Sequence, residues 1–416
     1  MPLAHRFLIL VLPVVSLAVS CRAESRPALG GAGWIPAFRQ DGGHRIMTND
    51  SMLQILHRRI PSFVDPTGRT PDTTPGLVVG IVTDSGPEVV NFGTKRIGQN
   101  SPPDGDTYFG IASLTKIFTG FILAKAVCEG TVRLDDSANL YLAKDLKLKD
   151  NSITLRQLVT HTSGLPDFPT NIRASKDLDK DGKSDSEDLN PARNYTRELL
   201  ADFLRTEAET EFKPGSRCQY SNLGIGLLSI LLQDKLGYAT FEDMNRTLIT
   251  GPLGMESTNT PSMLGKAVQN QAQGYSPKNG GVVAVAQSEM GVLAGSGELL
   301  STANDMVRLL QALTGVKNTK LKPVFDEAMK SLVFVENEAM AYGFRVKPSG
   351  DGGVFFAKPG ETAGYSAIIL WRQNPSLGIV ILANSGKCKH INRLAVRLME
   401  VAVGGSPASP IGDGEL

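Results

Sequence analysis

Residues 109–127 read FGIASLTKIFTGFILAKAV and place Ser113 three positions before Lys116. On a helix this spacing puts both side chains on one face, with about 5–6 Å between their Cβ atoms. A lysine amine at that distance can help to remove the proton of a serine hydroxyl, which is otherwise a poor nucleophile. Apolar residues flank the pair, so we do not expect Lys116 to lie on a solvent-exposed surface. The stretch therefore predicts a helix from Ser113 to about Glu129, ended by Gly130, with a candidate nucleophile at its start.

Two short motifs further along the chain carry residue types that could assist such a serine. Tyr220-Ser221-Asn222 precedes a predicted helix. A phenol can act as acid or base if a nearby cation lowers its pKa, and an Asn amide can donate to and accept from a peptide-like substrate. Lys358-Pro359-Gly360 ends an apolar run, where Lys358 could attract a carboxylate and Gly360 would let a substrate approach the backbone. Taken alone, Tyr220-Ser221-Asn222 is more typical of a loop that caps the following helix. Lys358-Pro359-Gly360 is also typical of a polar strand end before a turn.

Strand patterns stand near both ends of the chain and helical patterns lie between them. We therefore predict an α/β (α+β) fold, in which the two ends close one mixed lobe and an all-helical lobe is inserted at about 131–330. The predicted strands are 77–84, 88–96, 341–347, 353–358, 365–371 and 377–384, the first two forming a hairpin. The other predicted helices are 51–60, 155–160, 195–205, 224–235, 241–249, 303–313 and 390–403.

The N-terminal residues 1–20 have the features of a signal peptide. A short basic start precedes an apolar run that is too short for a stable membrane anchor, and small residues precede Cys21. These residues also resemble a bacterial lipobox, in which acyl chains on Cys21 would attach the protein to a membrane. Plain secretion is the alternative. We expect an exported protein of the bacterial periplasm or cell envelope, lipid-anchored at Cys21, with a tether over 21–48 and a flexible tail over 405–416.

The composition excludes several classes of partner. The formal net charge is +1 and no basic run is present, so we expect no nucleic-acid partner. None of the five histidines stands in a zinc-type spacing. Three further cysteines follow Cys21. We expect Cys128 to be buried on the helix that carries the candidate nucleophile. A disulfide between Cys218 and Cys388 is possible, but the sequence does not decide whether it forms.

The acidic segment 177–188 matches the calcium-loop template. Acidic residues occupy loop positions 1, 3, 5, 9 and 12, and Gly182 occupies position 6, where the loop turns sharply. We expect a structural calcium ion here, with a solvated acidic loop as the alternative. The candidate ligands are Asp177, Asp179, Asp181, the Lys183 carbonyl, Asp185 and Asp188.

The three motifs, in the order Ser-x-x-Lys, Tyr-x-Asn and Lys-x-Gly, resemble those of the serine β-lactamases and penicillin-binding proteins. The segments 155–166 (LRQLVTHTSGLP), 252–258 and 295–306 are also similar to segments of that family. The resemblance covers about residues 75–400. Within the family, the chain looks most like the AmpH-type D-alanyl-D-alanine carboxypeptidase/endopeptidases, which are relatives of the class C β-lactamases. It implies one hydrolase domain over 49–404, with an antiparallel sheet flanked by terminal helices.

The resemblance also implies a role for each motif residue. Ser113 would attack the carbonyl of a peptidoglycan peptide or a β-lactam, and Lys116 and Tyr220 would transfer its proton. The backbone N–H groups of Ser113 and Glu361 would form the oxyanion hole. Asn222 would hold the substrate amide, and Lys358 would supply positive potential. No cofactor is implied for catalysis, and His161 is implied to be structural.

Two residues depart from the family's pattern. Pro359 stands where the family often has Thr, so a hydroxyl and a backbone donor are missing. Glu361 places an acid where many relatives have a small residue. Both changes favour a peptidase or an esterase over an efficient β-lactamase. A penicillin-binding sensor that is acylated once would need the same Ser113.

Overall fold

The computed structural model describes residues 38–41, 44–70, 72–173, 192–264, 268–278 and 280–404. The predicted signal peptide, Cys21, the calcium-type loop 177–188 and the tail 405–416 lie outside these residues. Within the described part of the chain, no helix is both long enough and apolar enough to cross a membrane.

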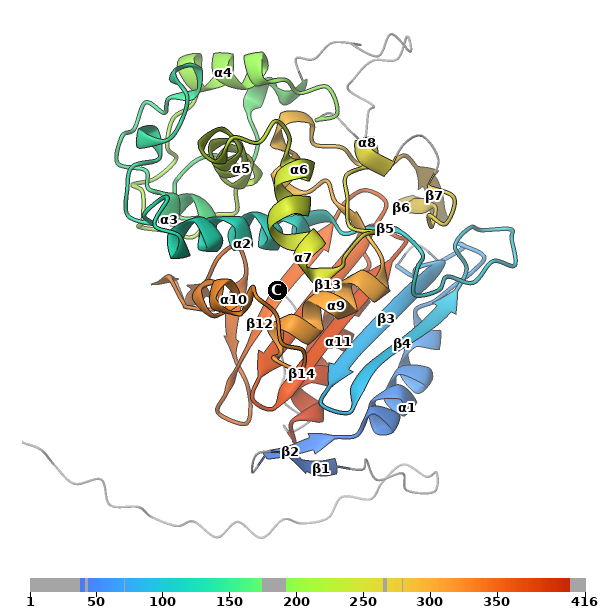
Figure 1. Ribbon diagram of the computed structural model, residues 1–416. Coiled ribbons are helices and arrows are strands. Elements are labelled where there is room, and N and C mark those ends of the chain that lie inside the picture. Colours follow the sequence, from blue (N-terminus) through green and yellow to red (C-terminus); the bar gives the residue numbers. More distant parts are fainter. Residues whose placement is uncertain are drawn as a thin grey trace, which may run out of the picture. The chain divides into compact units, whose positions relative to one another are not determined.

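One antiparallel sheet of eight strands forms the centre of the fold, in the order β4-β3-β14-β13-β12-β11-β10-β9 (Figure 1). The predicted first hairpin is confirmed, with Gly86 at its turn in the left-handed region (φ 113°). Strand β3 is buried along its whole length, whereas no residue of β4, at the sheet edge, is fully buried. The strands are β3 Gly76–Thr83, β4 Gly86–Gly93, β9 Val333–Val335, β10 Glu338–Met340, β11 Arg345–Pro348, β12 Val354–Glu361, β13 Ser366–Gln373 and β14 Ser376–Ala383.

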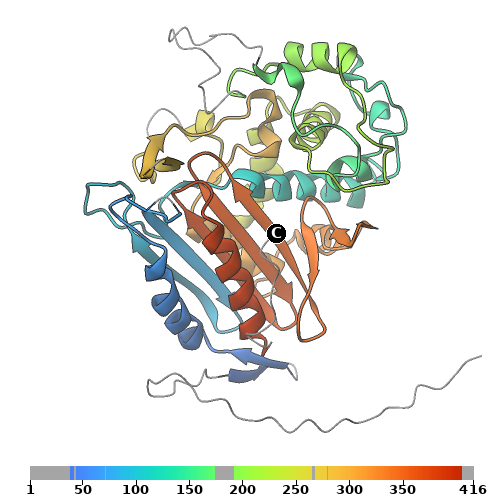
Figure 2. The same cartoon turned by 180° about the vertical axis from the view of Figure 1, so that it is seen from behind.

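Helices cover both faces of this sheet. The terminal helices α1 (Asn49–Arg59) and α11 (Lys389–Ala402) pack on one face, as Figure 2 shows. On the other face lie α2 (Thr115–Cys128), α9 (Ala303–Leu313) and α10 (Lys322–Ala328). Because alternate residues of a strand point to opposite faces, β3 contributes Val78 and Val82 to one core and Leu77, Val79 and Ile81 to the other.

The second lobe surrounds α2 and α5, which are apolar on all sides and buried. Its helices are α3 Leu155–Val159, α4 Arg197–Thr206, α5 Asn222–Leu236, α6 Phe241–Asn245, α7 Gly251–Leu253 and α8 Pro261–Leu264. Short 3-10 turns are η1 Ile60–Ser62, η2 Ala112–Leu114, η3 Ala138–Leu140, η4 Lys144–Leu146, η5 Thr170–Arg173 and η7 Gly291–Ser296, and η6 Arg246–Thr250 is a π-helical turn. Short strands pair as β1 Phe38–Asp41 with β2 His44–Met47, β5 Phe109–Gly110 with β8 Leu300–Ser301, and β6 Gly274–Lys278 with β7 Gly281–Val285.

Three predictions of element boundaries were wrong. The predicted tether contains the β1–β2 hairpin, and its Ile46 and Met47 are fully buried, so the folded domain begins before residue 49. The predicted all-helical lobe contains the β6–β7 hairpin, and α9 and α10 in its range pack against the sheet side of the core. The strand predicted at 341–347 begins only at Arg345, because a turn with Gly343 at φ 85° precedes it.

Candidate active site

Ser113 lies on the 3-10 turn η2, directly before α2, and lines a pocket of about 480 Å³. The preceding Ala112 has φ 49°, a left-handed conformation that is unusual for a residue with a side chain. Strained backbone of this kind persists where the surrounding structure holds it, and it is frequent at active sites. The turn presents the Ser113 hydroxyl to the pocket, while α2 is buried from Thr115 to Ala124.

The Lys116 amine is fully buried and has three close oxygen neighbours. Its Nζ lies 2.6 Å from Asn222 Oδ1, 2.5 Å from the Ser296 carbonyl oxygen and 3.2 Å from Ser113 Oγ. Burial, followed by the positive charge of Lys358, lowers the pKa of Lys116 well below its usual value. A neutral amine has two hydrogens and one lone pair. The two acceptors Asn222 and Ser296 take the hydrogens, so the lone pair is left for the Ser113 hydroxyl.

The Tyr220 hydroxyl forms a short hydrogen bond with Ser113 Oγ. Its ring lies between two lysines, with Lys116 Nζ 4.7 Å and Lys358 Nζ 4.9 Å from the ring centroid. Although 39% of Tyr220 is exposed to the pocket, loss of hydration raises its pKa above the ordinary tyrosine value. The hydrogen bond with Ser113 and the charge of Arg345 oppose this only in part. The condition stated above, a pKa lowered by a nearby cation, is therefore not met, and Tyr220 stays a protonated phenol.

Asn222 is held from both ends of its amide. Its Oδ1 accepts from Lys116, and its Nδ2 donates to Asp167 Oδ1 at 2.8 Å. The backbone N–H of Asn222 donates to the same carboxylate oxygen at 3.0 Å. Asn222 lines the pocket, but in this structure these contacts make it a positioning residue for Lys116. Asp167 was not predicted. The only signal for it is its place directly after the segment 155–166.

The His161 ring packs against the ring of Tyr220. Its Nδ1 accepts from the Ser221 backbone N–H at 3.2 Å, and its ring centroid lies 4.6 Å from that of Tyr220. Burial, with the charges of Lys358 and Lys116, lowers the pKa of His161 well below its usual value. Within the described residues its Nε2 has no hydrogen-bond partner. His161 is therefore a neutral packing partner of the phenol, and it makes no hydrogen bond to Ser113.

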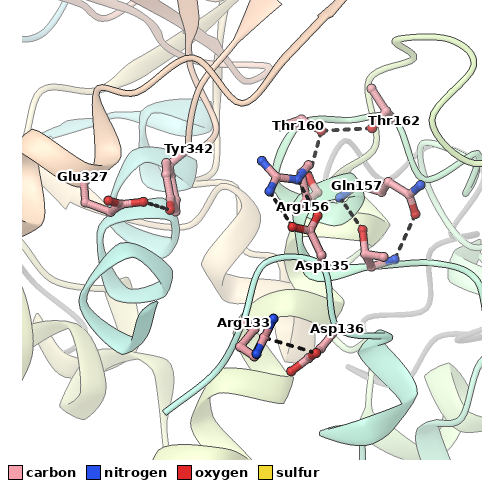
Figure 3. Close-up of polar contacts among 10 residues, drawn as sticks. Arg133, Asp135, Asp136, Arg156, Gln157, Thr160, Thr162, Glu327 and Tyr342 are labelled. Carbon is pink, nitrogen blue, oxygen red and sulfur yellow. Dashed lines mark hydrogen bonds and ion pairs between the residues drawn. The ribbon is translucent and has the colours of Figure 1, made fainter. Parts of the chain in front are cut away.

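The segment that carries His161 is fixed by local hydrogen bonds, some of which Figure 3 shows. Arg156 on α3 pairs with Asp135 through Nε at 2.7 Å and Nη2 at 2.8 Å. Thr160 Oγ1 bonds the Arg156 carbonyl at 2.8 Å and lies 2.9 Å from Thr162 Oγ1. A capping box that involves Gln157 fixes the start of α3. These contacts hold the chain on both sides of His161, which itself has φ 59°.

The last part of strand β12, near Ser113, has a partner strand on one side only. Its pairing with β11 stops at Ala357 opposite Arg345, so the segment from Lys358 to Glu361 has a partner only in β13. At the turn that follows, the Thr362 N–H donates to the Tyr365 carbonyl at 2.9 Å. Because amide directions alternate along a strand, the Glu361 N–H points away from β13, toward the free edge. The predicted oxyanion donor therefore has no partner in β13.

Gly360 allows β12 to approach Ser113 closely. A Cβ atom at this position would lie 2.6 Å from the Ile111 carbonyl oxygen and 3.1 Å from the Ser113 nitrogen. No residue with a side chain fits there without displacing backbone. The close approach brings β12 beside the Ser113 backbone nitrogen, and Ser113 and Glu361 both line the pocket. A shared oxyanion hole formed by their N–H groups stays a prediction.

Lys358 and Arg345 form a cationic end of the pocket. Burial, followed by the charge of Arg345, lowers the pKa of Lys358 to about 7. Arg345 Nε lies 3.0 Å from Glu338 Oε2, and its buried Nη1 has no hydrogen-bond partner among the described residues. Arg345 was not predicted. Only the register of β11 against β12 places it beside Lys358, and the sequence motifs do not contain that information.

The described cysteines are free thiols. Cys218 and Cys388 both line the pocket but are not bonded to each other. Cys128 is exposed in the last turn of α2, so the expectation that it is buried was wrong. Within the described residues, no group of His, Cys, Asp and Glu could hold a metal ion.

Known proteins share this sequence pattern. The family model of the β-lactamases matches residues 67–400. The D-alanyl-D-alanine-carboxypeptidase/endopeptidase AmpH of Escherichia coli (strain K12) is 33% identical over 227 residues, which cover 53% of this chain and 52% of that protein. A β-lactamase of the same strain is 27% identical over 262 residues, which cover 62% and 60%. The chain thus spans about half the length of the first relative and less than two thirds of the second.

Solved structures share the fold. The octameric penicillin-binding protein homologue from Pyrococcus abyssi superimposes with a TM-score of 0.69 at 23% identity, over 86% of this chain and 78% of that chain. D-alanine carboxypeptidase AmpC from Burkholderia cenocepacia gives a TM-score of 0.66 at 21% identity, over 85% and 99%. The predicted fold class is therefore confirmed. Since the family model spans most of the sequence, the chain belongs to the β-lactamase family.

Proposed function

We propose that this protein is a serine hydrolase that forms an acyl-enzyme on Ser113 and acts as a D,D-carboxypeptidase/endopeptidase on peptidoglycan peptides. The observation that carries the proposal is the contact of Ser113 Oγ with both the Lys116 amine and the Tyr220 phenol. The AmpH relative is named for this activity. Such a substrate belongs to the cell envelope, which agrees with the signal-like N-terminus and the proposed lipid anchor at Cys21.

The geometry supports a sequence of proton transfers. The lone pair of Lys116 takes the proton of Ser113 as its oxygen attacks the substrate carbonyl. The N–H groups of Ser113 and Glu361 stabilise the oxyanion. The Tyr220 phenol, which stays protonated, donates to the leaving amine and regains a proton from Lys116. Water then enters, gives up a proton along the same route and hydrolyses the Ser113 ester.

Mass spectrometry and product analysis test this function. We expect an acylated D-alanyl-D-alanine peptide to release D-alanine, and a penicillin to leave a persistent adduct on Ser113. Rapid penicillin turnover without D-alanine release would favour a β-lactamase instead. An adduct without any peptide turnover would favour a penicillin-binding sensor. Hydrolysis of p-nitrophenyl acetate alone, with no adduct, would favour an esterase.

The cationic end of the pocket predicts a preference for substrates with a free carboxylate. We expect Arg345→Gln to lower kcat/KM about 10–100-fold for a peptide ending in a carboxylate, because a charged hydrogen bond is lost. The same variant should change kcat/KM for p-nitrophenyl acetate less than about threefold, since this ester has no carboxylate. Steady-state kinetics with both substrates measures the difference.

The matched control for Arg345 is Lys347→Gln. Lys347 lies on the same strand and also faces Glu338, at 3.5 Å, but it does not line the pocket. Lys347→Gln should leave the ratio of kcat/KM for the peptide to kcat/KM for p-nitrophenyl acetate unchanged. Equal losses on both substrates in Arg345→Gln would contradict a role in carboxylate binding.

A further inference from the structure

Glu298 follows η7 and carries a buried carboxyl group that the proposed proton transfers do not use. Only 6% of the residue is exposed. Its Oε2 accepts from the Met290 backbone N–H at 2.8 Å. Met290 stands directly before η7, so this hydrogen bond joins the two ends of the segment 290–298. One side chain thus closes the segment into a ring.

The backbone of this segment is irregular. Gly291 has φ 53°, and Leu293 departs from helical dihedral angles. The Leu293 N–H donates to the Met290 carbonyl at 3.0 Å, and the Glu298 N–H donates to the Ala294 carbonyl at 3.2 Å. Each of these backbone bonds stays within one half of the segment, whereas the Glu298 carboxyl group reaches across all of it.

The closed segment presents one of the two acceptors that hold the Lys116 amine. The Ser296 carbonyl oxygen, 2.5 Å from Lys116 Nζ, lies within it. The other acceptor, Asn222, is held by Asp167 through two hydrogen bonds. A carboxyl group therefore stands behind each acceptor, Asp167 behind Asn222 and Glu298 behind Ser296.

The same segment also borders the pocket, which Met290 and Gly297 line. If Glu298 only shaped this wall, its loss would change how tightly a ligand binds before any covalent bond forms. If it holds the Ser296 carbonyl in place, its loss would change how fast Ser113 is acylated. The two effects are separate kinetic quantities.

We propose that Glu298 is a positioning residue for the Lys116 amine and acts through the Ser296 carbonyl. By closing the segment 290–298, it keeps this carbonyl in place to accept one amine hydrogen, so the lone pair stays directed at Ser113 Oγ. A shift of about 1 Å in such a group can slow a reaction about 10²-fold. This role rests on the proposed acylation of Ser113 and adds a residue to it.

The chemistry of the carboxyl group determines which variants are informative. Burial raises the pKa of Glu298 to about 7, the Met290 N–H opposes the rise, and the charges of Glu242 and Glu289 add to it. A neutral carboxyl group still accepts through its carbonyl oxygen, as the amide of Gln does, whereas a Leu side chain accepts no hydrogen bond. Glu298→Gln therefore retains the bond across the segment, and Glu298→Leu removes it.

Rapid mixing with a fluorescent penicillin tests the role, because it measures the dissociation constant of the first complex and the rate constant of acylation separately. We expect Glu298→Leu to lower the rate constant about 10–100-fold and to change the dissociation constant less than about threefold. Glu298→Ala also removes the acceptor and should show the same loss, so the result does not depend on how one variant folds. Glu298→Gln should keep both values within about threefold of wild type.

Asp305→Leu is the matched control. Asp305 is also a buried carboxyl group whose Oδ2 accepts a backbone N–H, that of Ser257 at 2.8 Å, but it does not line the pocket. Asp305→Leu should lower the Tm, as a lost loop contact does, and leave the acylation rate constant of the folded protein unchanged.

The outcomes separate this role from the proposed function. If penicillin does not acylate the wild-type protein, the function itself fails, and the role of Glu298 fails with it. If the wild-type protein is acylated and Glu298→Leu and Glu298→Ala are acylated equally fast, only the positioning role is refuted. A change confined to the dissociation constant, or an equal loss of rate in Glu298→Gln, would also overturn it.

Discussion

Replacing Ser113 by Ala should lower kcat/KM for a D-alanyl-D-alanine peptide by at least about 10⁴-fold. The variant keeps the backbone N–H groups of the oxyanion hole but has no oxygen to form the acyl-enzyme. Penicillin should therefore leave no covalent adduct. Peptide kinetics together with intact-protein mass spectrometry measures both effects.

The control for Ser113→Ala is the replacement of an exposed serine that does not line the pocket. Ser85→Ala, at the β3–β4 turn, should retain both the adduct and the wild-type rate. Retention of peptidase activity in Ser113→Ala would assign the nucleophile to another residue. Circular dichroism should give the same spectrum for both variants, since Ser113 contributes little to the core.

Replacing Lys116 by Met should slow acylation about 10²–10⁴-fold, because a positioned general base is lost. The same change should not destabilise the protein, and we expect it to raise the Tm. In the folded protein the Lys116 pKa is well below its ordinary value, whereas in the unfolded chain it returns to about 10.4. At neutral pH, folding must therefore remove a proton from Lys116, which costs free energy. Methionine fills the space without that cost.

The lowered pKa of Lys116 also predicts how its effect on the free energy of unfolding changes with pH. Between the lowered folded pKa of Lys116 and about 10.4, the unfolded state binds more protons. The contribution of Lys116 to the free energy of unfolding thus rises with pH in that window, and Lys116→Met should lose this rise. Thermal unfolding at several pH values measures it. Lys125→Met, a charged position on the same helix, serves as control for helix propensity. A large fall in Tm for Lys116→Met alone would contradict the argument.

Local patterns were sufficient to predict much of this fold. The helix predicted at 303–313 matches α9, because its apolar spacing and its Thr302 cap are both contained in a few residues. The turn before Arg345 and the hairpin within the predicted tether were missed. Their conformations depend on distant partners, namely α2 for Gly343 and the core beneath α11 for Ile46.

The candidate site was predictable in its residues but not in its electrostatics. Motif order identified Ser113, Lys116 and Tyr220 as partners, and the structure brings them into contact. The raised pKa of Tyr220 could not be foreseen, because it depends on how many protein atoms displace water around the phenol. Arg345 and Asp167 were missed for a related reason. Strand register and loop packing place them, and neither property is encoded within a short motif.

The free edge of β12 also bears on how the molecule avoids self-association. An unpaired strand edge is a template for a strand from another chain, and it can seed edge-to-edge aggregation. At this edge Pro359 stands opposite Ile368 and has no N–H to offer a further strand. Since its nitrogen faces away from β13, as that of Glu361 does, the proline removes no bond from the sheet. A short substrate can still bond to Glu361, whereas a long incoming strand meets an interrupted ladder and cannot extend the sheet.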